Sequence, residues 1–188
     1  MVEIYAELVK NKVKTIDEVP EELRIAVKQA LGMDVTDAEK LNAAIAQKLS
    51  EVSSECGQTI RNGLDVGLSS GTHHFSLTDD DQTNINSIFN AVILGASEYP
   101  YHADGECCTV FKASDIIKLY IATKTFITNA TTYNNMLRLW IKRETNIDVL
   151  KTITYGSDLP DDLKAQMQEI LSSANNQIQS IVSKLGNI

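Results

Sequence analysis

The chain has 188 residues, of which 43% are hydrophobic and 22% charged, with nine glycines and three prolines. This composition is typical of a folded, helix-rich globular protein and excludes a disordered one. The formal net charge of −8 and the scattered lysines and arginines argue against a nucleic-acid partner.

Residues 1–33 predict a helical hairpin. Ile4 and Leu8 share one apolar helix face, and Leu23 and Val27 belong to the apolar stripe of a second helix. A hairpin of this size is too small to be stable alone, so we expect it to attach to a partner through these four side chains. The first residues lack the features of a signal peptide, and no apolar run approaches the roughly 20 residues of a membrane span. We therefore expect a chain that is made and kept in the cytosol and has no membrane span.

A long amphipathic helix is predicted from residue 37 onward. Thr36 and Glu39 have the spacing of a capping box, in which each side chain binds the backbone N–H of the other residue. Apolar residues then recur every three or four positions, at Leu41, Ile45, Leu49, Val52, Cys56 and Ile60. Cys56 lies on this stripe and is predicted to be a packed core thiol. The odd total of three cysteines, two of them adjacent, favours free thiols over disulfides.

The stretch HFSLTDDDQTNI, residues 74–85, changes from a strand pattern to a helix pattern. Phe75 and Leu77 would share one face of a strand. Thr78 then has the position of a helix N-cap, and the three aspartates of residues 79–81 fill the first turn, where the helix dipole favours negative charge. A calcium loop would need ligands at alternate positions, a glycine between them and a distal glutamate, and this stretch has neither the glycine nor the glutamate. Helix capping is therefore the preferred interpretation, with metal binding or a partner contact as alternatives.

Residues 99–111 predict a β-hairpin around Asp104 and Gly105, because a two-residue Asp-Gly turn suits the type I′ geometry. Counting outward pairs His102 with Cys107 on one face of the hairpin. The opposite, apolar face would hold Tyr99, Tyr101, Cys108 and Val110. Imidazole and thiolate are good zinc ligands, and either histidine of the preceding strand could approach the pair, but no fourth ligand is evident. The pair is interpreted as a surface contact, with a zinc or thiol site as the alternative.

A second long helical tract is predicted from Ser114 onward, with Ser114 as its cap and Asp115 in its first turn. The threonine-rich stretch TNATT, residues 128–132, weakens helix propensity near the centre of the tract. We therefore expect a bend or a break there.

The C-terminal residues 157–188 predict an amphipathic helix with a narrow apolar seam close to a heptad repeat. Its positions are Leu163, Met167, Ile170, Ala174, Ile178, Ile181 and Leu185. A seam of this kind needs a partner helix, either the 36–62 helix of the same chain or the same tail in a second copy. Five of these residues are candidate partner-binding positions: Met167, Ile170, Ile178, Ile181 and Leu185.

These elements predict a mainly α, α+β protein with a small antiparallel sheet. The expected organisation is an N-terminal hairpin at 1–33, a core domain at 34–156 and a C-terminal helix at 157–188. No nucleotide-binding or hydrolase motif is present, and the three histidines leave no convincing nucleophile–base pair. We therefore expect no catalytic residue, no cofactor and no metal, and a role in assembly rather than catalysis.

The order of elements across residues 36–156 resembles a family. The stretch HFSLTDDDQTNI, the hairpin motif YHADG, the helix start KASDI and the closing NIDVLKTITYG are similar to an uncharacterised domain of bacteriophage tail proteins. The segment KTIDEVPEELR resembles helical segments of tail and baseplate proteins in phages and in phage-tail-like bacteriocins of Gram-positive bacteria. The shared positions are structural, and the resemblance implies no catalytic residue. They are Phe75, Leu77, Asp81, Gln82, Asn84, Asp104 and Gly105.

The resemblance implies a structural part of a phage tail or contractile tail-like particle, at the baseplate or fibre junction. Such a part would be assembled in the bacterial cytoplasm and would form homo- or hetero-oligomers with other tail, baseplate or fibre proteins. Two alternatives stay open at this point. One is a tail-fibre assembly chaperone that is absent from the finished particle, and the other is a zinc or thiol enzyme centred on His102 and Cys107.

Overall fold

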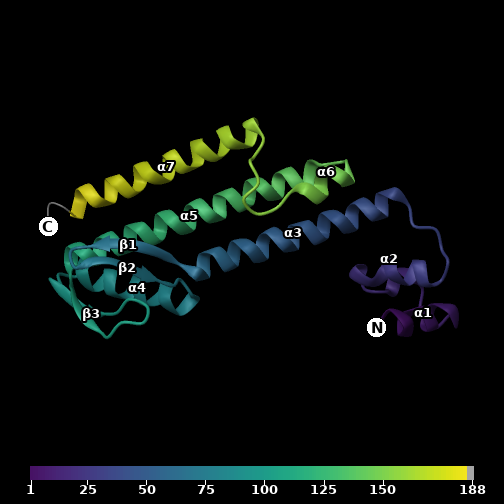
Figure 1. Ribbon diagram of the computed structural model, residues 1–188, viewed down its shortest axis with the longest axis horizontal. Coiled ribbons are helices and arrows are strands. Elements are labelled where there is room, and N and C mark those ends of the chain that lie inside the picture. Colours follow the sequence, from purple (N-terminus) through teal and green to yellow (C-terminus); the bar gives the residue numbers. More distant parts are fainter. Residues whose placement is uncertain (186–188) are drawn as a thin grey trace. The chain divides into compact units, whose positions relative to one another are not determined.

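The protein is described here by a computed structural model that covers residues 1–185, and it is mainly helical with two small β-hairpins (Figure 1). The helices are α1 (Val2–Lys10), the 3-10 helix η1 (Ile16–Glu18), α2 (Glu21–Ala30), α3 (Asp37–Asn62), α4 (Asp79–Ile93), α5 (Ala113–Arg143), α6 (Ile147–Thr152) and α7 (Asp161–Leu185). The strands are β1 (Leu64–Leu68), β2 (Gly71–Phe75), β3 (Glu98–Tyr101) and β4 (Thr109–Lys112). This architecture confirms the predicted mainly α, α+β fold class. Within residues 1–185, no helix combines the length and the hydropathy needed to cross a membrane.

The chain divides into two compact units that do not follow chain order. The first unit combines residues 1–50 with residues 141–154, and the second combines residues 51–140 with the chain from Tyr155 onward. The predicted domain limits after residues 33 and 156 stay a prediction.

The first unit contains the predicted N-terminal hairpin, in which α2 packs against α1 and η1. Val19 and Val27 are fully buried there. Arg24 fastens the turn before α2, because its Nε donates to the Val19 carbonyl at 2.8 Å and its Nη2 donates to the Asp17 carbonyl at 2.8 Å. The second segment of the unit adds α6, with Leu150 buried on it.

The predicted capping box at the start of α3 is present. The Thr36 backbone N–H donates to Glu39 Oε2 at 2.9 Å, and the Glu39 N–H donates to Thr36 Oγ1 at 3.2 Å. Lys28 of α2 also pairs with the Glu39 carboxylate. The hydrogen bond from Lys28, followed by those from Thr36, lowers the pKa of Glu39 to about 2. The Glu39 side chain therefore caps the start of α3 and also links α2 to α3.

A hydrophobic core of the second unit is built by both hairpins, α4 and the start of α5. The buried side chains of this cluster are Val66, Phe75, Leu77, Ile85, Ile88, Phe89, Tyr101, Ala103, Phe111, Ile116 and Leu119. Residues 64–68 form strand β1 against β2, and this strand was not predicted from the sequence. The sequence feature that indicates this strand is the alternation of Leu64, Val66 and Leu68 with Asp65 and Gly67, which is the pattern of a half-buried strand.

Gly63 connects α3 to β1 and has φ +78°. A Cβ atom built on it would lie 1.8 Å from the Phe75 carbonyl oxygen. Both the left-handed backbone and the close approach of β2 therefore require glycine here.

The aspartate triplet begins α4 as predicted. Thr78 Oγ1 accepts from the Asp81 N–H at 3.3 Å, and Asp81 Oδ2 accepts from the Thr78 N–H at 3.0 Å. Gln82 Nε2 donates to the Leu77 carbonyl at 2.9 Å, so this backbone group just before α4 also has a hydrogen-bond partner. The triplet is therefore helix-start chemistry.

Helix α5 differs from prediction at two points. It runs without interruption from Ala113 to Arg143, so the expected break at residues 128–132 is absent, and Thr131 Oγ1 instead donates to the Ile127 carbonyl at 2.7 Å. The helix also begins one residue before Ser114. Asp115 is 2% exposed and accepts from the Ser69 N–H at 2.9 Å, which anchors the β1–β2 turn to α5. Burial tends to raise the pKa of Asp115, but the hydrogen bonds from Ser69 outweigh it and the pKa lies below its ordinary value.

The second hairpin exists, but its predicted register is wrong by one residue. Tyr99 pairs with Phe111 and Tyr101 pairs with Thr109, so residues 102–108 form a loop rather than a two-residue turn. A one-residue slip turns every side chain of a strand to its other face. Phe111 is consequently buried against Phe75, with ring centroids 6.4 Å apart, and Val110 is 59% exposed. Burial of the larger aromatic ring in the core explains why this register is preferred.

Candidate functional site

The first candidate docking surface lies on α1, a helix with no buried residue. Met1, Ile4 and Val13 are 74%, 59% and 67% exposed, and we call these three residues the N-terminal apolar surface. Of the other predicted partner residues, Leu8 and Leu23 are half-buried, and Val27 lies in the interior of the unit. Val27 is therefore a core residue, and the accessible apolar area comes from α1 and the segment that follows it.

The second candidate docking surface lies on α7, whose apolar seam is divided between two faces. Leu163 is buried, and four further positions are half-buried: Met167, Leu171, Ala174 and Ile178. Leu171 takes the place that the prediction gave to Ile170. Ile170 and Ile181 are instead 42% and 47% exposed, and their spacing of 11 residues, close to three helical turns, places them on one side of the helix. The side chain of Leu185 lies outside the described residues.

The loop of residues 102–108 is anchored to the edge of β2 by Asp104. The Asp104 backbone N–H donates to the His74 carbonyl at 3.0 Å. Its carboxylate accepts from the Ser76 N–H at 3.1 Å and from the Ser76 hydroxyl. The Asp-Gly pair therefore docks the loop on its neighbour, with Gly105 at φ +73° allowing the chain to turn.

The same loop brings Glu106 to His73, a contact that was not predicted from the sequence. His73 Nδ1 lies 2.9 Å from Glu106 Oε1, and His73 Nε2 lies 2.8 Å from Ser70 Oγ. The imidazole also rests edge-on against Phe111, with ring centroids 6.3 Å apart. We call Ser70, His73 and Glu106 the hairpin triad. The sequence offers no motif for it, because Glu106 is 33 residues from His73 and arrives only through the loop contact.

The predicted pair of His102 and Cys107 is not a cross-strand pair, since both residues lie in the loop beyond the ladder. His102 Nδ1 faces the Ala103 carbonyl at 3.3 Å, and Cys107 and Cys108 are exposed thiols. Over residues 1–185, no group of three or more histidine, cysteine, aspartate or glutamate side chains is arranged to hold a metal ion. Cys56 is buried and donates to the Ala130 carbonyl at 3.5 Å, which confirms its predicted place in the core.

His74 has partners of a different kind from those of His73. Its Nδ1 lies 2.7 Å from Asp65 Oδ1, and its Nε2 lies 2.8 Å from the Asn62 carbonyl, the last residue of α3. Both partners only accept, so this geometry favours the protonated ring, in which both nitrogens donate. The hydrogen bond to Asp65, and then that to Asn62, raises the pKa of His74. His74 also lies at a helix C-terminus, where the helix dipole favours the protonated ring.

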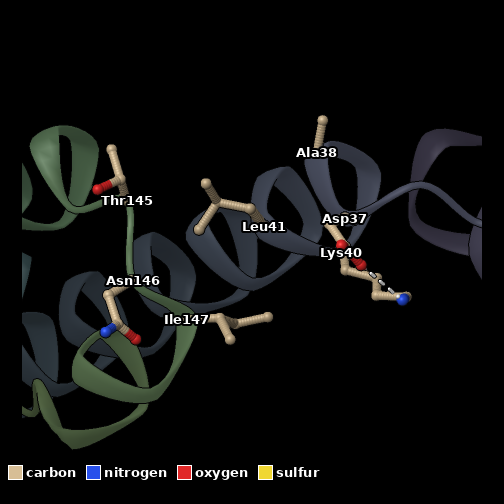
Figure 2. Close-up of a pocket in the computed structure, with 7 residues that line it drawn as sticks. All are labelled: Asp37, Ala38, Lys40, Leu41, Thr145, Asn146 and Ile147. Carbon is tan, nitrogen blue, oxygen red and sulfur yellow. Dashed lines mark hydrogen bonds and ion pairs between the residues drawn. The ribbon is translucent and has the colours of Figure 1, made fainter.

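A hollow of about 580 Å³ lies in the first unit, between the starts of α3 and α6 (Figure 2). Leu41 and Ile147 supply its half-buried apolar lining, and the remaining lining residues are Asp37, Ala38, Lys40, Thr145 and Asn146. The polar groups already serve the chain: Lys40 Nζ pairs with Asp37 Oδ1 at 2.8 Å, and Asn146 Oδ1 accepts from the Asp148 N–H at 2.9 Å. No charge is directed into the hollow without a partner, so its chemistry does not indicate a ligand.

Comparisons with models of protein families, with curated proteins and with solved structures found no match.

Proposed function

We propose that the protein is a structural component of a bacteriophage tail or a contractile phage-tail-like particle, at the baseplate or the fibre junction, and that it acts by docking onto other subunits. The observation that carries the proposal is the N-terminal apolar surface. Met1, Ile4 and Val13 are each more than half exposed, and they lie on or next to α1, a helix that buries none of its own residues. The resemblance of residues 36–156 to a phage tail domain supplies the biological setting.

These three side chains supply part of the energy that a docked contact needs. Full burial of a large aliphatic side chain contributes about 1.5–3 kcal/mol, so covering the exposed parts of three of them gives on the order of 3–6 kcal/mol before ordering costs. Exposed Glu3 and Glu7 flank Ile4 on α1, and lysines follow at positions 10, 12 and 14. The partner that fits is therefore an apolar groove whose rim carries charges of both signs.

The test is incorporation into particles. Mass spectrometry of purified particles should find the protein at fixed stoichiometry, and Ile4→Glu should reduce that amount because it places a charge in the buried contact. Leu94→Glu is the matched control, since Leu94 is 89% exposed at the end of α4 and is not part of either docking surface. Absence of the wild-type protein from finished particles would instead identify an assembly chaperone. Equal incorporation of both variants would end the docking proposal for α1.

The exposed pair on α7 extends the proposal to contacts between copies. Truncating the chain after Gly156 would remove α7, but it would also remove the buried Leu159 and Leu163. The double variant Ile170→Ser, Ile181→Ser changes only the two exposed residues and is therefore the sharper test. Sedimentation velocity should show a smaller oligomer for this variant if α7 joins two copies. An unchanged sedimentation coefficient would remove α7 from the assembly surface.

A further inference from the structure

The hairpin triad has the hydrogen-bond order of a nucleophile, a base and a group that orients the base. An ionised Glu106 carboxylate only accepts, so the proton on His73 lies on Nδ1. In the neutral ring Nε2 then carries a lone pair, and the Ser70 hydroxyl 2.8 Å away donates to it. In this arrangement an imidazole accepts the proton of a serine while the serine attacks.

The base is held in place by its surroundings. The His73 side chain is only 15% exposed and rests edge-on against the core residue Phe111. Glu106 comes from the loop that Asp104 fastens to β2. The imidazole therefore has its orientation before any ligand arrives, which is a requirement for an efficient base.

The nucleophile is accessible. Ser70 is exposed in the turn that joins β1 to β2, and the next residue is glycine. A Cβ built on Gly71 would lie 3.9 Å from His73 Nε2, so the missing side chain leaves space beside the reacting atoms. An exposed turn of this kind suits a small acyl group.

His74, the adjacent imidazole, provides an internal contrast. Both of its ring nitrogens donate, to Asp65 and to the Asn62 carbonyl, so it has no free lone pair to accept a proton. Only His73 of these two neighbours is poised as a base.

We propose that Ser70 is a nucleophile activated by His73, and that it accepts small acyl groups from activated carboxylic esters. Ser70 Oγ forms a bond to the carbonyl carbon as its proton passes to His73 Nε2. The carbon–oxygen bond to the alcohol then breaks, and the alcohol leaves with that proton. Water attacks the acyl-serine in the same way, its proton passes through His73 to Ser70 Oγ, and the carboxylic acid is released. Ser70 and His73 are the catalytic residues, and Glu106 is a positioning residue.

The first test uses full-length protein and a fluorophosphonate reagent, which bonds to activated serines with loss of fluoride. Peptide mass spectrometry should find the label on Ser70 and not on Ser87, an exposed serine of α4 whose hydroxyl donates to the Thr83 carbonyl at 2.9 Å and has no imidazole partner. His73→Gln should slow the labelling about a hundredfold, in the range that general-base catalysis supplies. Circular dichroism verifies that this variant is folded, and if it is not, the comparison of Ser70 with Ser87 in the wild-type protein decides.

The second test uses 4-nitrophenyl acetate with protein in which Cys107 and Cys108 are alanine, because exposed thiols also attack this ester. Acetyl should map to Ser70, and Ser70→Ala should abolish the release of nitrophenolate above background. Labelling of Ser70 no faster than that of Ser87, or an unchanged labelling rate in folded His73→Gln, would overturn the proposal.

The role of Glu106 has a readout of its own. Nitrogen NMR of the imidazole should show the Nδ1–H tautomer of His73 in the wild-type protein and a shift toward Nε2–H in Glu106→Leu, which has no acceptor, with slower labelling of Ser70. An unchanged tautomer would exclude the positioning role. This inference is independent of the proposed docking function, and neither set of experiments bears on the other.

Discussion

Replacing Gly63 with alanine tests how tightly the end of α3 and strand β2 are packed. The residue has φ +78°, and its new Cβ would lie 1.8 Å from the Phe75 carbonyl oxygen and 2.7 Å from the Ser76 Cα. Backbone atoms of β2 cannot rotate away as the end of a long side chain can. The strand itself has to move by more than 1 Å to restore an ordinary contact distance of roughly 3 Å or more.

The expected loss of stability has two parts. A left-handed backbone costs a non-glycine residue about 1 kcal/mol. Displacing β2 disturbs the pairing of Leu64 with Phe75 and the hydrogen bond from the Leu77 N–H to the Arg61 carbonyl, at about 1 kcal/mol each. Together these terms predict a decrease of about 3 kcal/mol in the free energy of unfolding, with a further loss where Phe75 leaves its packed position.

Urea denaturation followed by circular dichroism measures this loss. Gly105→Ala is the matched control, because Gly105 lies in the same unit at φ +73° with no atom within 4 Å of the new Cβ. It should lose only the backbone term of about 1 kcal/mol. Equal losses in the free energy of unfolding for the two variants would show that the close approach of β2 to Gly63 does not contribute to the loss, which would refute this prediction.

Three further predictions concern the pH dependence of stability and the core. The raised pKa of His74 stabilises the fold fully below the unfolded value of 6.5, and this contribution is lost as the pH rises through the folded value, so the urea midpoint should fall there in wild type but not in His74→Gln. An equal pH response in His74→Gln would contradict this. The pKa of Glu39, lowered to about 2 mainly by Lys28, stabilises the fold above the unfolded value of 4.5 and is lost as the pH falls toward 2. The free energy of unfolding of Glu39→Gln should therefore fall less steeply in acid than that of the wild type. An equally steep fall in both proteins would contradict this prediction. Leu77→Ala, at a fully buried side chain, should cost about 2–5 kcal/mol by urea denaturation, whereas a loss below about 1 kcal/mol would mean that the core collapses around the gap.

Local chemistry explains what the sequence predicted well. The capping boxes of Thr36 with Glu39 and of Thr78 with Asp81 involve residues three positions apart, so the helix starts are specified by the residues themselves. The same holds for the apolar stripe of α3, whose Cys56 is buried as expected.

Long-range packing explains what the sequence did not reveal. The register of the second hairpin depends on whether Phe111 or Val110 enters the core, and both are apolar residues of a plausible strand. The Asp-Gly pair suggested a tight turn, whereas Asp104 bonds to Ser76 of another segment. The contact of Glu106 with His73 follows from that docking, so no spacing within the sequence could indicate it.

The two thiols of the 102–108 loop have a practical consequence for measurements of assembly. Cys107 and Cys108 are exposed, and dissolved oxygen can oxidise an accessible thiol and the thiol of a second molecule to an intermolecular disulfide during purification in air. A covalent dimer formed in this way would sediment like a docked one without using either apolar surface. Species that disappear when dithiothreitol is added therefore report oxidation, and those that persist in the reductant report genuine association.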